Sequence, residues 1–239
     1  MSLNNAVEHV KSDNLQEYSF KVLVVGEKSV GKTSIIQRYT KGEFFRKCKP
    51  TLGADFASKV IDWDSKTQVH LHLWDIGGHE RYGHMTRVYY KYAMAAFIVF
   101  DLCRPNTWNM VLKWYDDLKQ NVLTEDGSTI PIVLLANKCD EEDAKCDNTI
   151  LTTFCDELGF NGWLPVSAKT NRNIDEAMDL IIREIFTNQP EKKCIRPGTP
   201  WFRAESPMPM QDIAVYGNDK EENMHSVVAG NEAKQSRCC

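Results

Sequence analysis

The sequence feature that most constrains the fold is the glycine-rich segment Gly26–Thr33, which fits the pattern G-x-x-x-x-G-K-[ST]. It follows an apolar run, Phe20–Val25, typical of a buried parallel strand, and precedes a stretch with helical character, Ser34–Tyr39. Backbone N–H groups in such a loop turn inward at the positive end of the following helix, so the segment predicts a cradle for phosphate oxygens. The residues expected around the phosphates are Glu27, Lys28, Ser29, Val30, Gly31, Lys32, Thr33 and Ser34.

Strand-like and helical patterns alternate along the rest of the chain. The expected strands are Phe20–Val25, Asp55–Trp63, Gln68–Trp74, Met94–Asp101, Ile132–Asn137 and Leu164–Ser167, and the expected later helices are Thr107–Asn121, Thr149–Leu158 and Ile174–Phe186. A short polar turn joins only the second and third strands, which predicts one hairpin. The pattern therefore predicts an α/β fold with a doubly wound, mostly parallel six-stranded sheet and one antiparallel edge strand.

The domain organisation follows from changes in chain character. Residues 1–19 form a short polar lead-in, and residues 20–186 carry the alternating elements of a single domain. Residues 187–239 are rich in proline and lack sustained apolar periodicity, so we expect a largely disordered tail. A chain of 239 residues accommodates one such domain and a tail, but hardly two full-sized domains.

Two later motifs select the base of a nucleotide. Asn137, Lys138 and Asp140 follow the fifth expected strand, and Ser167, Ala168 and Lys169 follow the sixth. Guanine presents two adjacent N–H donors on one edge, which the single carboxylate of Asp140 can accept together, whereas adenine offers no such pair. The lysine stems can lie against the ring faces, and the Ala168 N–H can donate to the guanine 6-oxygen. The sequence therefore favours a guanine nucleotide over an adenine nucleotide.

A metal site is expected beside the phosphates. Asp75 ends the third strand, where its carboxylate is well placed to hold Mg²⁺ through water, and the Thr33 hydroxyl can ligate the same ion. Gly78 permits close approach of its N–H to the γ-phosphate, and Thr51 lies on a loop that can close over the metal. These are the parts of a loop switch that is ordered with GTP and released with GDP.

Composition excludes several other classes of protein. The formal net charge is −4, which argues against broad binding to nucleic acid. The longest apolar run is too short to span a membrane, and Ser2 stands where N-myristoylation requires glycine. The cysteines lack zinc-ligand spacing, so we expect reduced thiols in a protein made in the cytosol.

Together these residues resemble the Ras-like small GTPases, and the Rab family in particular. Leu52–Phe56 resembles the first Rab switch signature, His70–Trp74 the strand before the second switch, and Tyr89–Ala93 the motif after it. Ile76 and the segment Met85–Lys91 resemble the Rab branch that serves lysosome-related organelles.

The resemblance implies a monomeric, GTP-hydrolysing switch that controls vesicle and organelle trafficking. It implies that Phe44 packs against guanine and that Phe56, Trp74 and Tyr89 form the surface read by effectors. It implies catalytic roles for Lys32, Gly78 and His79. The implied partners are an exchange factor, a GTPase-activating protein, effectors, a GDP-dissociation inhibitor and the prenylation machinery.

One residue departs from the family pattern at the catalytic position. His79 stands where the family usually has the glutamine that orients the attacking water, and imidazole lacks the paired donor and acceptor of an amide. The sequence therefore predicts slow intrinsic hydrolysis. A hydrolysis-deficient, GTP-loaded adaptor is the alternative, and a nucleoside kinase sharing the phosphate loop is a third hypothesis that the Asp140 and Ala168 motifs disfavour.

The chain ends in Arg237-Cys238-Cys239, which resembles a doubly prenylated Rab tail. A single lipid chain gives only marginal membrane binding, so two adjacent thiols supply the two anchors that stable attachment requires. Acidic and basic residues are balanced in the tail, so electrostatic attraction to anionic lipid should contribute little. We therefore expect reversible attachment of Cys238 and Cys239 to the cytosolic face of endosomal or lysosome-related membranes.

Overall fold

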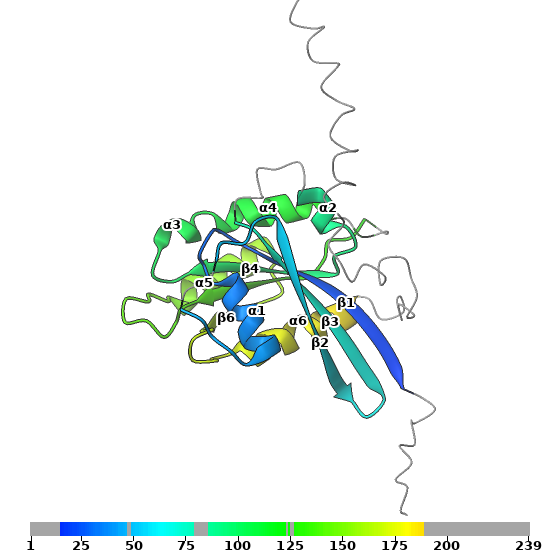
Figure 1. Cartoon of the computed structure of the whole chain (residues 1–239). Helices are drawn as coiled ribbons and strands as arrows, with labels where there is room; N and C mark the ends of the chain where they lie inside the picture. The colour runs from blue at the N-terminus through cyan, green and yellow to red at the C-terminus, as the bar shows by residue number, and fades with distance from the viewer. Residues whose placement is uncertain (1–14, 47–48, 79–85, 123, 125–126, 189–239) are drawn as a thin grey trace, which may run out of the picture. The chain divides into compact units, whose positions relative to one another are not determined.

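The computed structural model describes residues 15–46, 49–78, 86–122, 124 and 127–188, and Figure 1 shows their arrangement. Its strands are β1 (Gln16–Val25), β2 (Ala54–Asp64), β3 (Thr67–Ile76), β4 (Ala95–Asp101), β5 (Ile132–Asn137) and β6 (Trp163–Val166). They form one sheet in the order β2-β3-β1-β4-β5-β6, in which β2 pairs with β3 antiparallel and every other pair is parallel. The expected sheet with one antiparallel edge strand is confirmed.

Helices cover both faces of this sheet. They are α1 (Lys32–Lys41), α2 (Thr86–Tyr90), α3 (Pro105–Trp108), α4 (Val111–Asn121), α5 (Asn148–Leu158) and α6 (Ile174–Asn188). Side chains of α1 and α6 share one buried cluster with Phe97 and Val99 of β4, whereas those of α4 and α5 share the other cluster with Ile98 and Phe100. Because successive strand residues point to opposite faces, β4 is buried on both sides, and the fold is doubly wound.

The first strand is longer than the predicted Phe20–Val25. It begins at Gln16, inside the segment expected as a polar lead-in, because Gln16 pairs with Thr67 and its N–H donates to the Lys66 carbonyl at 2.7 Å. The pairing with β3 is a long-range backbone interaction. A local apolar pattern does not reveal it, since the outer residues of β1 are exposed.

The predicted single helix Thr107–Asn121 is wrong in two respects. A helix already begins at Pro105, and it ends at Trp108 before α4 begins at Val111. Between them the Met110 N–H donates to the carbonyl of Thr107, three residues back, which tightens the chain into a turn. The Thr107 hydroxyl also donates to the carbonyls of Asp101 and Arg104, so the start of this region is held by β4. The short helix α2 was not predicted.

The sheet order reverses around β1. The chain leaves β1 for β2 and β3 on one side of it, and later adds β4, β5 and β6 on the other side. In doubly wound sheets, ligands bind outside the carboxyl ends of the strands at such a reversal.

Among the described residues, no helix is both long and apolar enough to cross a membrane.

Candidate functional site

The phosphate loop, Gly26–Thr33, connects the end of β1 to the start of α1. Gly31 adopts φ 102° immediately before the helix, and a Cβ there would lie 2.2 Å from the Asn137 side-chain nitrogen, so only glycine fits. The Asn137 amide in turn donates to the Val30 carbonyl at 2.7 Å. The loop that follows β1 is thus joined directly to the end of β5, 107 residues further along the chain.

Lys32 is the buried cation of this loop. Its ammonium donates to the carbonyls of Gly26 at 2.9 Å and Glu27 at 3.0 Å, and the side chain is 6% exposed. Desolvation lowers the pKa of Lys32 to about 8, although the nearby carboxylates of Asp75 and Glu27 act in the opposite direction. An ammonium that remains this poorly compensated is suited to bind an anion. Around it, Val30 is buried, Glu27, Gly31, Thr33 and Ser34 are half-buried, and Lys28 and Ser29 are exposed.

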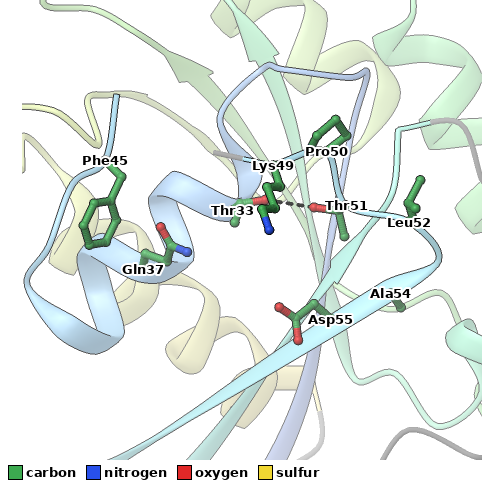
Figure 2. Close-up of a pocket in the computed structure, with 9 residues that line it drawn as sticks. All are labelled: Thr33, Gln37, Phe45, Lys49, Pro50, Thr51, Leu52, Ala54 and Asp55. Carbon is green, nitrogen blue, oxygen red and sulfur yellow. Dashed lines mark hydrogen bonds between the residues drawn. The ribbon is translucent and has the colours of Figure 1, made fainter. Parts of the chain in front are cut away.

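Three oxygen-bearing side chains expected to hold a metal lie together. Asp75 Oδ2 accepts from the hydroxyls of Thr33 at 2.5 Å and Thr51 at 2.9 Å, and the two hydroxyl oxygens are 3.1 Å apart. Figure 2 shows the contact between Thr33 and Thr51. Asp75 is 3% exposed, and its Oδ1 is buried without a hydrogen-bond partner among the described residues. These residues fit Mg²⁺, a hard cation that prefers oxygen ligands.

Burial raises the pKa of Asp75, and the hydrogen bond from Thr33 and the charge of Lys32 offset only part of that effect. A cation beside this carboxylate would remove the remaining cost of its charge.

The two loops expected to switch are already in contact with each other and with the phosphate loop. The Gly77 N–H donates to the Gly53 carbonyl at 2.8 Å. A Cβ on Gly78 would lie 2.3 Å from the Lys28 backbone nitrogen, so this glycine permits a close approach that any side chain would prevent. Thr51, Gly53 and Gly78 therefore bring the ends of β2 and β3 onto the phosphate loop.

A cavity of about 490 Å³ opens beside Thr33 and Thr51, between α1 and the segment before β2. Figure 2 shows the residues that line it: Thr33, Gln37, Phe45, Lys49, Pro50, Thr51, Leu52, Ala54 and Asp55. Phe45 is 51% exposed there, whereas its neighbour Phe44 is half-buried and packs against the core cluster of α1 and α6. The expected contact of Phe44 with a base stays a prediction.

The two motifs expected to contact the base meet at the ends of β5 and β6. The Ser167 hydroxyl donates to Asp140 Oδ1 at 2.5 Å, and the Lys169 ammonium lies 3.1 Å from Asp140 Oδ2. Burial raises the pKa of Asp140, but these two contacts outweigh it and hold the pKa below its usual value. The carboxylate is therefore charged at neutral pH and positioned by residues of the neighbouring strand.

The turn that carries Ala168 is held from the opposite side. Arg38 of α1 donates to the carbonyls of Ala168 at 2.8 Å and Lys169 at 3.1 Å. Sequence reasoning missed Arg38, because nothing in the local pattern of a half-buried helix residue indicates a contact 130 residues away.

Asp101 and Arg104 were also missed. Asp101 ends β4 at the same sheet edge, and its Oδ2 accepts from the Lys138 ammonium at 2.6 Å and from Arg104 at 2.7 Å. The signal that could have found Asp101 is its position at a strand's carboxyl end, which it shares with Asp75 and Asn137.

Two of the three side chains of the expected effector surface, Phe56 and Trp74, are in contact with each other. The rings of Phe56 on β2 and Trp74 on β3 are stacked, with centroids 6.0 Å apart, and the Lys21 ammonium lies 3.9 Å from the Trp74 ring centroid. Tyr89 is half-buried in α2, with its hydroxyl close to Gly53. The predicted roles of His79, Cys238 and Cys239 concern positions outside the described residues.

Comparison with known proteins shows which family of proteins the chain belongs to. The Ras family model matches residues 21–187. Ras-related protein Rab-32 of Mus musculus is 52% identical over 175 residues, covering 73% of this chain and 78% of that protein. Ras-related protein Rab-32B of Dictyostelium discoideum is 46% identical over 187 residues (77% and 72%), and Rab-7L1 of Homo sapiens is 42% identical over 176 residues (74% and 87%).

The chain therefore belongs to the Ras family of small GTPases. Within that family it is a Rab GTPase, a regulator of membrane trafficking, close to the branch that serves lysosome-related organelles. The resemblance found in the sequence is confirmed, and the relatives do not favour the alternative of a hydrolysis-deficient adaptor. Membership of the family implies GTP hydrolysis, guanine nucleotide binding with Mg²⁺, and association with endomembranes.

Proposed function

We propose that the carboxyl edge of the sheet binds GTP and GDP with Mg²⁺, and that the residues predicted from the sequence carry this binding. Lys32 and the backbone of Gly26–Thr33 hold the phosphates, while Asn137, Lys138, Asp140 and the Ser167–Lys169 turn hold guanine. When bound, Mg²⁺ would neutralise part of the negative charge of the phosphates. Thr33, Thr51 and Asp75 are its protein-side partners.

The observation that carries this proposal is the convergence of Thr33, Thr51 and Asp75. Their oxygens lie within 2.5 to 3.1 Å of one another although they come from α1, the loop before β2, and β3. Thr51 is the partner expected to leave when the γ-phosphate is absent, because it lies on the loop before β2, which is expected to close over the metal only when that phosphate is present. The departure of Thr51 from Thr33 and Asp75 would be the switching event.

Selectivity for guanine should depend on Asp140. Substitution of Asp140 by alanine removes the carboxylate that accepts both guanine donors, so the affinity for GDP should fall roughly 100-fold, while the weak affinity for ADP should not fall. Competition titration against a fluorescent guanine nucleotide measures both values. The control is Asp143→Ala, an exposed carboxylate in the same loop. Undiminished discrimination in Asp140→Ala would contradict the assignment.

We further propose that hydrolysis is slow because His79 follows Gly78 where an amide would orient water. Replacing His79 by glutamine should raise the single-turnover rate of GTP hydrolysis about tenfold, because an amide offers a donor and an acceptor to one water. The control is His70→Gln on β3, which leaves the phosphate site unchanged. Ordinary small-GTPase rates in the wild type, with no gain in His79→Gln, would refute this proposal.

Membrane attachment is proposed to occur through Cys238 and Cys239, with residues 187–239 as the tail that links residues 20–186 to the lipid. Protein isolated from eukaryotic cells should carry two isoprenoid groups by intact mass, and Cys238→Ser with Cys239→Ser should remove both and release the protein from the membrane fraction. The exposed thiol of Cys146 provides the matched control, since Cys146→Ser should leave the mass increment and the fractionation unchanged.

Partners are proposed to read the nucleotide state through Phe56, Trp74 and Tyr89. These side chains lie on β2, β3 and α2, the elements that flank the two switching loops, so a change at Thr51 or Gly78 is transmitted to them. Effectors, an exchange factor and a GTPase-activating protein are expected on this side. A GDP-dissociation inhibitor and the prenylation machinery are expected to engage the lipidated tail.

A further inference from the structure

An ionic cluster at the end of β4 lies between the phosphate loop and the guanine motif. Asp101 is 1% exposed, and its carboxylate accepts from Lys138 at 2.6 Å, from the Arg104 Nε at 2.7 Å and from the Cys103 N–H at 3.0 Å. Burial raises the pKa of Asp101, but the hydrogen bonds from Lys138 and Arg104 outweigh it and hold the pKa below its usual value. Asp101 is therefore a buried carboxylate with two cationic partners.

Arg104 also reaches the phosphate loop. Its Nη2 donates to the Lys28 carbonyl at 3.0 Å, so one guanidinium bridges the end of β4 and the crest of a loop 76 residues away. The backbone of Arg104 is fixed at the same time. Its N–H donates to the Asp101 carbonyl at 3.0 Å, and its carbonyl accepts from the N–H and the hydroxyl of Thr107. The planar guanidinium is thus held at both ends, which a lysine ammonium could not reproduce.

The contact with Lys28 sets the orientation of one peptide plane. In a trans peptide the C=O and the following N–H point in opposite directions, so a Lys28 carbonyl held by Arg104 turns the Ser29 N–H away from Arg104. Ser29 has φ 59°, a left-handed conformation of the kind that makes successive N–H groups converge on an anion. Fixing this plane before ligand binding reduces the ordering cost of binding phosphate.

The charges of the cluster also favour the binding of phosphate. One carboxylate, Asp101, faces two cations, Lys138 and Arg104, which leaves one positive charge in excess. The Arg104 guanidinium is also close enough to Lys32 to contribute to the lowering of the Lys32 pKa, after the larger effect of burial. The cluster therefore places an excess positive charge between the guanine motif and the phosphate loop.

We propose that Arg104 is a positioning residue for the bound guanine nucleotide: by holding the Lys28 carbonyl and the Asp101–Lys138 pair together, it ties the phosphate loop to the guanine motif and slows nucleotide release. This inference rests on the proposed nucleotide site. Arg104 acts through Lys28 and Lys138, and its loss leaves the metal-side residues Thr33, Thr51 and Asp75 in place.

The test is the rate at which a fluorescent N-methylanthraniloyl-GDP, preloaded with Mg²⁺ on the full chain, is released into excess GDP. Arg104→Ala should accelerate release about tenfold or more, since two charge-assisted hydrogen bonds are lost. Arg104→Lys keeps the charge but cannot span both acceptors, so its release rate should fall between those of the wild type and Arg104→Ala. The control is Arg183→Ala, an exposed arginine on α6, which should release at the wild-type rate.

Thermal unfolding of the same variants separates positioning from folding. Arg104→Lys should unfold within a few degrees of the wild type and still release nucleotide faster, so the inference remains testable even if Arg104→Ala does not fold. Release within twofold of the wild type in both variants would overturn it, as would full restoration by lysine, which would leave only a charge effect. If the wild type itself fails to bind the GDP probe, the proposed nucleotide site fails instead.

Discussion

At the scale of single residues, the site consists of charges that the protein alone compensates incompletely. Lys32 and Asp75 are buried together, and burial shifts both pKa values toward the neutral form. Each attracts the other, yet neither has a full set of opposite charges around it. A phosphate beside Lys32 and a cation beside Asp75 would give each of these two side chains the opposite charge that it lacks. The unliganded site therefore stores an electrostatic cost that binding relieves, which explains why nucleotide and metal should bind together.

This argument predicts a pH dependence for nucleotide binding. In the empty protein the pKa of Lys32 is about 8, and phosphate must raise it, so above pH 8 binding requires uptake of a proton. The affinity for GDP, measured by titration from pH 7 to pH 9, should be level below pH 8 and should then fall by up to tenfold per pH unit.

Lys21 supplies the matched control for that experiment. Burial also lowers its pKa to about 8, but its ammonium lies over Trp74 and donates to the Lys91 carbonyl, away from the phosphate loop. Lys21→Met should keep the wild-type pH profile of GDP binding. An affinity that stays level to pH 9, or a profile that disappears in Lys21→Met, would show that Lys32 is not the titrating group.

At the scale of elements, the sequence predicts what local patterns determine and misses what distant contacts determine. Each predicted strand is present, because continuous apolar runs such as Ile132–Asn137 are typical of strands buried on both faces. The early start of β1 and the break between α3 and α4 were missed, since they depend on pairing with β3 and on hydrogen bonds of Thr107 to the end of β4.

The same distinction applies to the candidate site. The motif residues were placed correctly at strand ends, and the structure brings Thr33, Thr51 and Asp75 together as expected. Arg38 and Arg104 were not foreseen, because each donates to backbone carbonyls, and any residue type provides a carbonyl. Sequence motifs identify side chains that touch a ligand more readily than those that hold a loop in place.

One element offers a direct test of local stability. Asp147 caps α5, the helix that follows the guanine motif, by accepting from the N–H groups of Thr149 at 3.0 Å and Ile150 at 3.1 Å. Asp147→Ala should lower the free energy of unfolding by about 1 kcal/mol, because two helix N–H groups lose their acceptor. Urea unfolding of the GDP-loaded protein measures the change. Asp147→Ser, which retains an acceptor, should recover most of the loss, and equal stabilities of the alanine and serine variants would contradict the capping role.

At the scale of the whole molecule, the sheet order explains how one ligand can control distant surfaces. The phosphate loop leaves β1, the metal residues come from the β2–β3 side, and the guanine motifs come from β5 and β6 on the other side. Arg38, Asn137 and Arg104 already connect these segments across more than 70 residues of chain each. A nucleotide bound as proposed would act as a further connection, and its γ-phosphate would act on the β2–β3 side, where the aromatic surface lies.

Hydrogen exchange should reveal this arrangement. Adding a non-hydrolysable GTP analogue and Mg²⁺ to the empty protein should slow amide exchange together in residues 26–33, 49–54, 137–141 and 167–172, because one ligand joins these loops and suppresses their local opening. The hairpin turn at residues 64–67 lies at the opposite end of β2 and β3 and serves as an internal control. Chelation of Mg²⁺ with the analogue still in excess should restore fast exchange in residues 49–54 first and leave 137–141 protected, since Thr51 depends on the metal and Asp140 on the base. Protection of the turn to the same degree as the loops, or loss of protection in all four segments at once on chelation, would mean that the metal and guanine sides do not respond separately.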